Sequence, residues 1–273
     1  MYFVRLCALS VKLVIQRAIC CALMSTCAWA AEPIHHTVRI EGRGSVTVIL
    51  ASGLGDTLDT WDTVQQLIAA NCARTLAYDR AGYSGSKPAL GPRDAEHIVQ
   101  ELRTELHDRG IRPPYVLVGH SLGGLYMQYF ARQHPDEVAG LVLVDSTHWN
   151  QQLLLDTKPP AYTGRQATML FMTWIARREL ADSVSAGEQV HESPRAGRFP
   201  TIVLSSTRPA RGETPATRAA AARLQEEIAA DFPAARLVRV ERSGHYIQAD
   251  RPEVVIDAAR ELAGCARIRR DAR

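Results

Sequence analysis

Short apolar runs alternate with stretches of helical periodicity along most of the chain. The runs are rich in Val, Ile and Leu and are bounded by turn residues, which is typical of strands buried on both faces. They occupy residues 45–53, 75–79, 115–119, 139–145, 201–206 and 235–241. Helical patterns lie between or after them, at residues 60–70, 93–110, 122–135, 215–232 and 252–264. This alternation predicts an α/β fold with a mostly parallel central sheet and helices on both faces. In the first helical pattern we expect one buried face, formed by Trp61, Val64, Leu67 and Ile68.

Residues 146–199 interrupt the alternation. The interval is too long for a simple connection, and it holds two apolar clusters with helix-like spacing, "QQLLL" and "MLFMTWI". It follows a strand directly, and open α/β sheets bind their ligands at the carboxyl ends of their strands. Long intervals of this kind are usually functional. We therefore expect a helical lid or cap over the ligand site in preference to a structurally inert excursion. The two clusters suggest an apolar group on the ligand, although such clusters more often serve the packing of the lid itself.

The first thirty residues are typical of a signal peptide. Three basic residues and no acidic one accompany the apolar run "AICCALMSTCAWA", and Ala-Trp-Ala at 28–30 fits a cleavage site. A retained N-terminal anchor is the alternative. We expect residues 1–30 to be a leader, residues 31–273 to form one domain, and the protein to be periplasmic or secreted. No later run reaches eighteen apolar residues, so no transmembrane span is expected in the mature chain.

Removal of this leader changes the charge and the cysteine content. The whole chain has 32 basic and 29 acidic residues, and three of the basic ones lie in the leader, so the mature chain is close to neutral. Its charge gives no reason to expect a nucleic-acid partner. Only Cys72 and Cys265 remain, either as one disulfide or as two buried thiols. No Cys/His cluster has zinc spacing, and neither a metal nor a cofactor is expected. These features predict no particular oligomeric state.

Ser121 is the candidate nucleophile. It is the central residue of "GHSLG" at 119–123, which matches G-x-S-x-G between a predicted strand and a predicted helix. This setting places a serine hydroxyl on a sharp turn above the sheet, at the amino end of a helix, where negative charge is favoured. A serine needs a base to become a useful nucleophile. His245 follows the last predicted strand in "ERSGHYIQADRP" and is the candidate base. We expect His120 to point away from the site, because it adjoins the nucleophile on the turn.

The third member of such a site is an acid that orients the histidine. Asp145 ends the strand 139–145 and lies between Ser121 and His245 in the chain. We prefer it to Glu213, the first carboxylate after the strand 201–206. Two backbone N–H groups are expected to bind the oxyanion, from Leu122 after the nucleophile and from Leu54 in the loop "ASGLGDT".

Taken together, these motifs resemble the α/β-hydrolase superfamily over residues 37–264. The resemblance rests on "GHSLGG", "SGHYIQADRPEVV", "AYDRAGYSGSKP" and "HPDEVAGLVLVD". It implies the α/β-hydrolase fold and a serine hydrolase that cleaves carboxylic esters of a small-molecule substrate through an acyl-enzyme. Two departures stand out. Ser52-Gly53 replaces the His-Gly common in the family's oxyanion loop, and the acid follows an earlier strand than usual.

The resemblance leaves other functions open. The same three residues could serve an amidase, a peptidase or an acyltransferase, and a binding protein with an inactive site is a more remote alternative. In this fold the helices that end at Cys72 and at Cys265 cover the same face of the sheet. The resemblance therefore also implies a Cys72–Cys265 disulfide.

Overall fold

The computed structural model describes residues 36–70, 72–88, 91–151 and 172–265. The expected signal peptide lies outside these residues, as do most of "QQLLL" and the first three residues of "MLFMTWI". The predictions for those segments therefore stay predictions.

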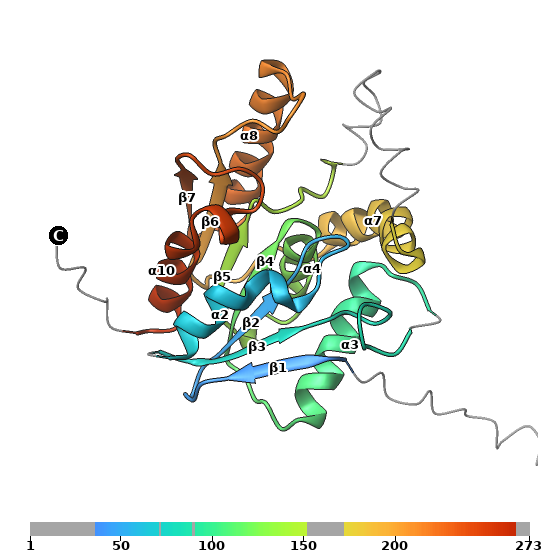
Figure 1. Ribbon diagram of the computed structural model, residues 1–273, viewed down its shortest axis with the longest axis vertical. Helices are drawn as coiled ribbons and strands as arrows, with labels where there is room; N and C mark the ends of the chain where they lie inside the picture. Colours follow the sequence, from blue (N-terminus) through green and yellow to red (C-terminus); the bar gives the residue numbers. More distant parts are fainter. Residues whose placement is uncertain (1–35, 71, 89–90, 152–171, 266–273) are drawn as a thin grey trace, which may run out of the picture. The chain divides into compact units, whose positions relative to one another are not determined.

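The described residues contain one seven-stranded sheet with the order β1-β3-β2-β4-β5-β6-β7 (Figure 1). The strands are β1 Val38–Glu41, β2 Thr47–Ala51, β3 Arg74–Tyr78, β4 Tyr115–His120, β5 Val138–Val144, β6 Thr201–Ser206 and β7 Ala235–Val240. Every neighbouring pair is parallel except β1 and β3, which are antiparallel. The predicted mostly parallel sheet is confirmed. The short edge strand β1 was not expected, because "VRIE" alternates and lacks the long apolar run of the inner strands.

Helices cover both faces of this sheet. They are η1 Leu58–Trp61, α2 Asp62–Ala69, α3 Ala95–Asp108, α4 Ser121–Gln133, η2 Pro135–Glu137, α7 Trp174–Glu192, α8 Pro215–Ala230, α9 Ile247–Asp250 and α10 Pro252–Leu262. Apolar residues of α2 and α10 bury one face, and those of α3, α4, α7 and α8 belong to the core on the other. Strand side chains alternate between the two cores: Val48 and Leu50 face the first, and Ile49 and Ala51 the second. Among the described helices, none combines the length and the apolar character needed to cross a membrane.

The expected buried face of the helix 60–70 is wrong at one position. Trp61, Val64 and Ile68 are fully buried, but Leu67 is 48% exposed. The helix is turned toward Gln65, whose amide exchanges hydrogen bonds with Arg39 of β1. Because β1 was not predicted, nothing in the pattern indicated that a glutamine would take the buried position.

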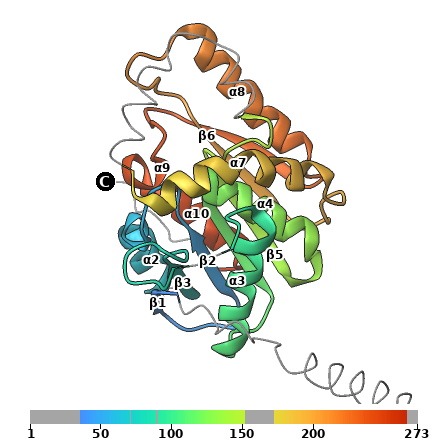
Figure 2. The same cartoon turned by 90° about the vertical axis from the view of Figure 1, so that its right-hand side faces the viewer.

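Helix α7 belongs to the interval that was predicted to be a lid. It lies across α3 and α4 (Figure 2). Ile175, Ala186 and Val190 are among its buried residues. A side-chain cap from Thr173 to the Ala176 N–H begins the helix. This part of the interval therefore packs firmly onto the helical layer.

A disulfide joins Cys72 and Cys265, 193 residues apart in the chain. Cys72 follows α2, Cys265 follows α10, and the two helices are in contact on one face of the sheet. The predicted pairing is confirmed.

Candidate active site

Ser121 is the first residue of α4 and follows β4 directly. Its φ of 50° lies in the left-handed region, which is strained for a residue with a side chain. The turn needs its flanking glycines, because a Cβ on Gly119 would lie 2.6 Å from the Gly124 Cα. A Cβ on Gly123 would lie 2.4 Å from the Ser52 carbonyl oxygen. The sequence thus encodes a tight strand–turn–helix in contact with the loop after β2.

His245 and Asp145 meet at the carboxyl edge of the sheet, although 100 residues separate them. The His245 Nδ1 lies 2.7 Å from the Asp145 Oδ2. Because a carboxylate only accepts, Nδ1 carries the proton and Nε2 is left as the basic nitrogen. The His245 side chain is 45% exposed and that of Asp145 only 11%. Water and small molecules can therefore reach the imidazole, while its acid is largely covered.

Ser206, the last residue of β6, holds Asp145 in place. Its backbone N–H donates to the Asp145 Oδ1 at 2.9 Å, and its hydroxyl donates to Oδ2 at 3.1 Å. Burial raises the pKa of Asp145, but the hydrogen bond and charge of His245 together with the Ser206 donors outweigh it, so the net pKa is lowered. Asp145 is therefore ionised at neutral pH.

The carboxylate of Glu213 has partners other than His245. Its Oε2 accepts from the Ala210 N–H at 2.7 Å and lies 3.8 Å from an Arg218 nitrogen. Of the two carboxylates weighed as the orienting acid, the structure brings only Asp145 to the histidine. Both line a cavity of about 170 Å³ beside His245, together with Gln151, Ser206 and Arg218 among others. In the part of the chain that the structure describes, no group of three His, Cys, Asp or Glu is arranged to hold a metal ion.

His120 points toward His245, contrary to the expectation that it would point elsewhere. Its Nε2 lies 3.1 Å from the His245 carbonyl oxygen, so Nε2 carries a proton and donates. The ring centroids of the two histidines are 4.7 Å apart. The His120 Nδ1 lies 3.6 Å from the Asp56 Oδ2. The Asp56 Oδ1 accepts from the Tyr246 hydroxyl. Burial lowers the pKa of His120 and favours its neutral form.

The loop after β2 contacts the turn around the candidate nucleophile Ser121, residues 119–123, here called the nucleophile turn, on two sides. The Ser52 carbonyl faces Gly123, and a Cβ on Gly53 would lie 2.9 Å from the His120 Nδ1. Leu54, the expected oxyanion donor, follows Gly53 and packs partly buried against the core. The second expected donor, Leu122, lies in the first turn of α4, where N–H groups have no intrahelical partner.

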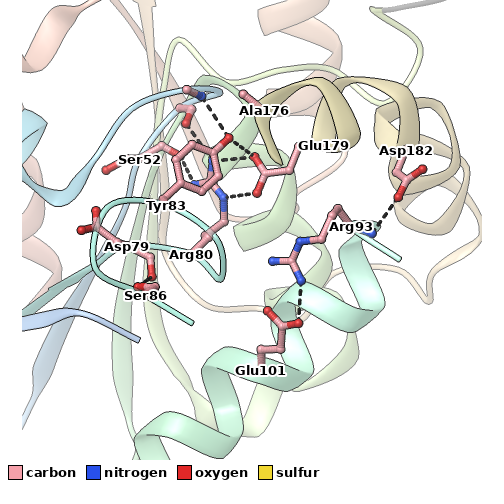
Figure 3. A network of polar contacts seen from close by, with 12 residues as sticks. Ser52, Asp79, Arg80, Tyr83, Ser86, Arg93, Glu101, Ala176, Glu179 and Asp182 are labelled. Atoms are coloured by element: carbon pink, nitrogen blue, oxygen red, sulfur yellow. Dashed lines mark hydrogen bonds and ion pairs between the residues drawn. The ribbon is translucent and has the colours of Figure 1, made fainter. Parts of the chain in front are cut away.

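An ion pair between Arg80 and Glu179 lies against the same loop (Figure 3). Neither residue was predicted from the sequence, and neither were the contact of His120 with His245 and the role of Ser206 in holding Asp145. Arg80 lies within the quoted stretch "AYDRAGYSGSKP", which carried only the family resemblance. No local pattern pointed to Glu179 on α7.

Comparison with known proteins gives one family match and several similar structures. Residues 48–258 match the model of the "Alpha/beta hydrolase family". The uncharacterized protein YqjL of Bacillus subtilis is 27% identical over 222 residues, which cover 81% of this chain and 84% of that protein. A thermophilic esterase from Thermogutta terrifontis superposes with a TM-score of 0.60 at 21% identity, covering 85% of this chain and 94% of that one. An enol-lactonase from Burkholderia xenovorans has a TM-score of 0.58 at 19% identity, covering 86% and 98%. At these identities the solved structures show the same fold.

Proposed function

Because the chain belongs to the alpha/beta hydrolase family and is a hydrolase, we propose that it is a serine hydrolase that cleaves carboxylic esters through an acyl-enzyme. One observation carries the proposal. The Asp145–His245 hydrogen bond of 2.7 Å lies at the sheet edge where β4 turns sharply into α4 at Ser121. A serine on a strained turn, a histidine and a buried carboxylate are the parts that acyl transfer needs.

In the proposed acylation, the Ser121 hydroxyl attacks the ester carbonyl while the His245 Nε2 takes its proton. Asp145 keeps the other nitrogen protonated, so the ring presents its lone pair to the serine. The lowered pKa of Asp145 keeps its negative charge available to stabilise the imidazolium that forms. The imidazolium then protonates the leaving alcohol as the C–O bond breaks. The acyl group remains on Ser121.

The N–H groups of Leu54 and Leu122 are proposed to bind the oxyanion of the tetrahedral intermediate. The contact between the loop after β2 and the nucleophile turn supports this pairing. Loss of one such donor typically costs about 3 kcal/mol of transition-state stabilisation. In deacylation, His245 activates a water molecule that attacks the acyl carbon. The proton returns to Ser121 and a carboxylic acid leaves.

Several observations support esters as the substrate class. The solved structures with this fold include the Thermogutta esterase, and the Burkholderia enol-lactonase is named for a cyclic ester. The apolar cluster "MLFMTWI" favours an apolar acyl or alcohol group. We further propose a periplasmic or secreted location, supported by the leader pattern of residues 1–30 and by the Cys72–Cys265 disulfide, which suits an oxidising compartment.

A fluorophosphonate probe and a panel of p-nitrophenyl esters of graded chain length test the proposal on the purified protein. We expect Ser121 to be labelled and esters to be hydrolysed with a preference for apolar acyl groups. The Ser121→Ala variant should lose labelling and at least about 10³-fold of the activity. Full esterase activity in Ser121→Ala would contradict the mechanism. An unlabelled wild-type protein would favour an inactive binding protein. Labelling together with hydrolysis of amides in place of esters would identify the substrates as amides.

A further inference from the structure

We propose that Arg80, backed by Glu179 of α7, is a positioning residue that sets the direction of the oxyanion-binding N–H of Leu54. The inference rests on the proposed serine-hydrolase function, because it assigns a role within the same site. It concerns two charged residues that do not contact the expected triad. It also gives helix α7 a part in catalysis that does not depend on covering the substrate.

Arg80 and Glu179 form a buried, bidentate ion pair. The Arg80 Nε donates to the Glu179 Oε1 at 2.7 Å, and Nη2 donates to Oε2 at 2.8 Å. The two side chains are 2% and 0% exposed. This planar fork-to-carboxylate geometry fixes the guanidinium more firmly than a single contact would. Removal of two charges from water is costly, so the pair calls for an explanation beyond packing.

Two further N–H donors of Arg80 are directed at the loop after β2 (Figure 3). Its Nη1 donates to the Ser52 carbonyl at 2.6 Å, and its Nη2 donates to the Gly53 carbonyl at 2.8 Å. In a trans peptide the C=O and the following N–H point in opposite directions. An arginine that holds the Gly53 oxygen therefore fixes the Leu54 N–H on the opposite side of the peptide plane. By the same geometry, the contact with Ser52 fixes the N–H of Gly53.

Tyr83 makes a second connection between α7 and this loop. Its hydroxyl donates to the Glu179 Oε2 at 2.8 Å and accepts from the Gly55 N–H at 3.2 Å. Burial, reinforced by the charge of Glu179, raises the pKa of Tyr83, so the phenol keeps the proton that it donates. Glu179 thus reaches residues on both sides of Leu54, through Arg80 on one side and Tyr83 on the other.

The loop has little freedom to compensate if these contacts are lost. Gly53 lies close to the His120 ring and to Asp56, and Ser52 lies close to Gly123 of the nucleophile turn. A rotation of the Gly53–Leu54 peptide would leave the backbone where it packs but would turn the donor away from the oxyanion. Misplacement of a catalytic group by about 1 Å can cost about 100-fold in rate.

The near-isosteric variant Glu179→Gln tests the inference in the full-length protein. It removes the charge and one of the two acceptors that hold Arg80. We expect kcat for a p-nitrophenyl ester to fall about 10- to 100-fold with KM changed less than about twofold, because oxyanion donors act mainly in the transition state. The rate of fluorophosphonate labelling should fall in parallel. Glu179→Asp, which keeps the charge, should recover part of the lost kcat.

Glu101→Gln is the matched control. Glu101 forms a 2.5 Å ion pair with Arg93, another arginine buried in the same region, but that pair does not contact the loop (Figure 3). The control should lose thermal stability while it keeps kcat near the wild-type value. Equal kcat losses in both variants, or an unchanged kcat in Glu179→Gln, would overturn the inference. A wild-type protein that neither reacts with the probe nor hydrolyses esters would instead overturn the proposed function, so the two failures are distinguishable.

Discussion

Two pairs that each contain a carboxylate flank the nucleophile turn, and they differ in their access to water. In the Asp145–His245 pair the histidine is 45% exposed and the acid 11%, whereas in the Arg80–Glu179 pair the exposed fractions are 2% and 0%. The first pair is proposed to exchange protons with the substrate and with water, which requires an open imidazole. The second carries charges that do not change during the reaction, and it fixes backbone groups.

The difference follows from the physical chemistry of the two tasks. A group that transfers protons must be reached by substrate, so solvent reaches it too. The hydrogen bond from His245 to Asp145 is kept in place because Ser206 holds that carboxylate. A buried ion pair is stiff because either charge alone would be strongly disfavoured in the interior. We therefore expect changes at the exposed pair to act on turnover, and changes at the buried pair to act on both folding and turnover.

The largest expected effect is that of Asp145→Asn. An asparagine amide favours the wrong tautomer of His245 and cannot stabilise the imidazolium. We expect turnover to fall by about 10³- to 10⁴-fold, with the melting temperature changed only slightly. Steady-state kinetics and a thermal melt on the same preparation measure both. Glu213→Gln serves as the control and should keep its activity. The reverse result would move the orienting role to Glu213.

The next effect concerns stability and uses Glu179→Ala. Removal of the carboxylate leaves the Arg80 charge buried without its partner, and we expect the free energy of unfolding to fall by about 3–5 kcal/mol. Denaturant titration measures this loss. Arg239→Ala breaks the exposed Arg239–Glu226 pair, whose side chains are 63% and 47% exposed, and should cost less than about 1 kcal/mol. Similar losses in the free energy of unfolding in the two variants would contradict the expectation that the buried pair contributes more to stability than the exposed one.

The smallest expected effect concerns His120, which lies beside the exposed pair but is itself buried. Burial lowers its pKa in the folded protein below the ordinary value of 6.5. The unfolded chain therefore binds more protons, and stability is lost as the pH falls from about 6.5 toward the folded pKa. Each unit of lowered pKa corresponds to about 1.4 kcal/mol, or about 3–5 °C in melting temperature.

The His120→Gln variant isolates this contribution. It removes the titratable ring but keeps an N–H donor for the His245 carbonyl. Its melting temperature should fall less than that of the wild type between pH 7.5 and pH 5. The groups that face the ring are Asp56, His245 and Tyr246, and all three are retained. His134 and His148, whose pKa values are also lowered by burial, contribute to both proteins. Parallel pH curves for the two proteins would assign the effect to those residues.

The inner sheet was predictable because its strands are buried on both faces and leave continuous apolar runs in the sequence. The same logic fails at the edge. β1 is only half buried and carries Arg39, so its four residues form no apolar run. Because β1 was not predicted, the orientation of α2 toward Gln65 was not predicted either. Burial that depends on an unpredicted neighbour leaves little trace in the periodicity of a single helix.

The candidate site was predictable where it depends on strand ends. Ser121, Asp145 and His245 each follow a strand directly or within a short loop, and the carboxyl ends of parallel strands meet at one edge of the sheet. Arg80 and Glu179 lie 99 residues apart, and their pairing is set by how α7 packs. The orientation of His120 depends on the path of the loop that carries His245. Such contacts follow from tertiary packing and have no local signature.

The disulfide between Cys72 and Cys265 turns most of the domain into a covalent ring. The exposed bond between Arg211 and Gly212 lies inside it, so a single tryptic cut there would leave both pieces attached to one another. Ser121 and Asp145 would be on one piece and His245 on the other. Reassembly of the two pieces into one site would remain unimolecular, and independent of protein concentration, for as long as the disulfide stayed oxidised. Reduction would make it a bimolecular encounter, so a nicked enzyme would lose activity on dilution only after reduction.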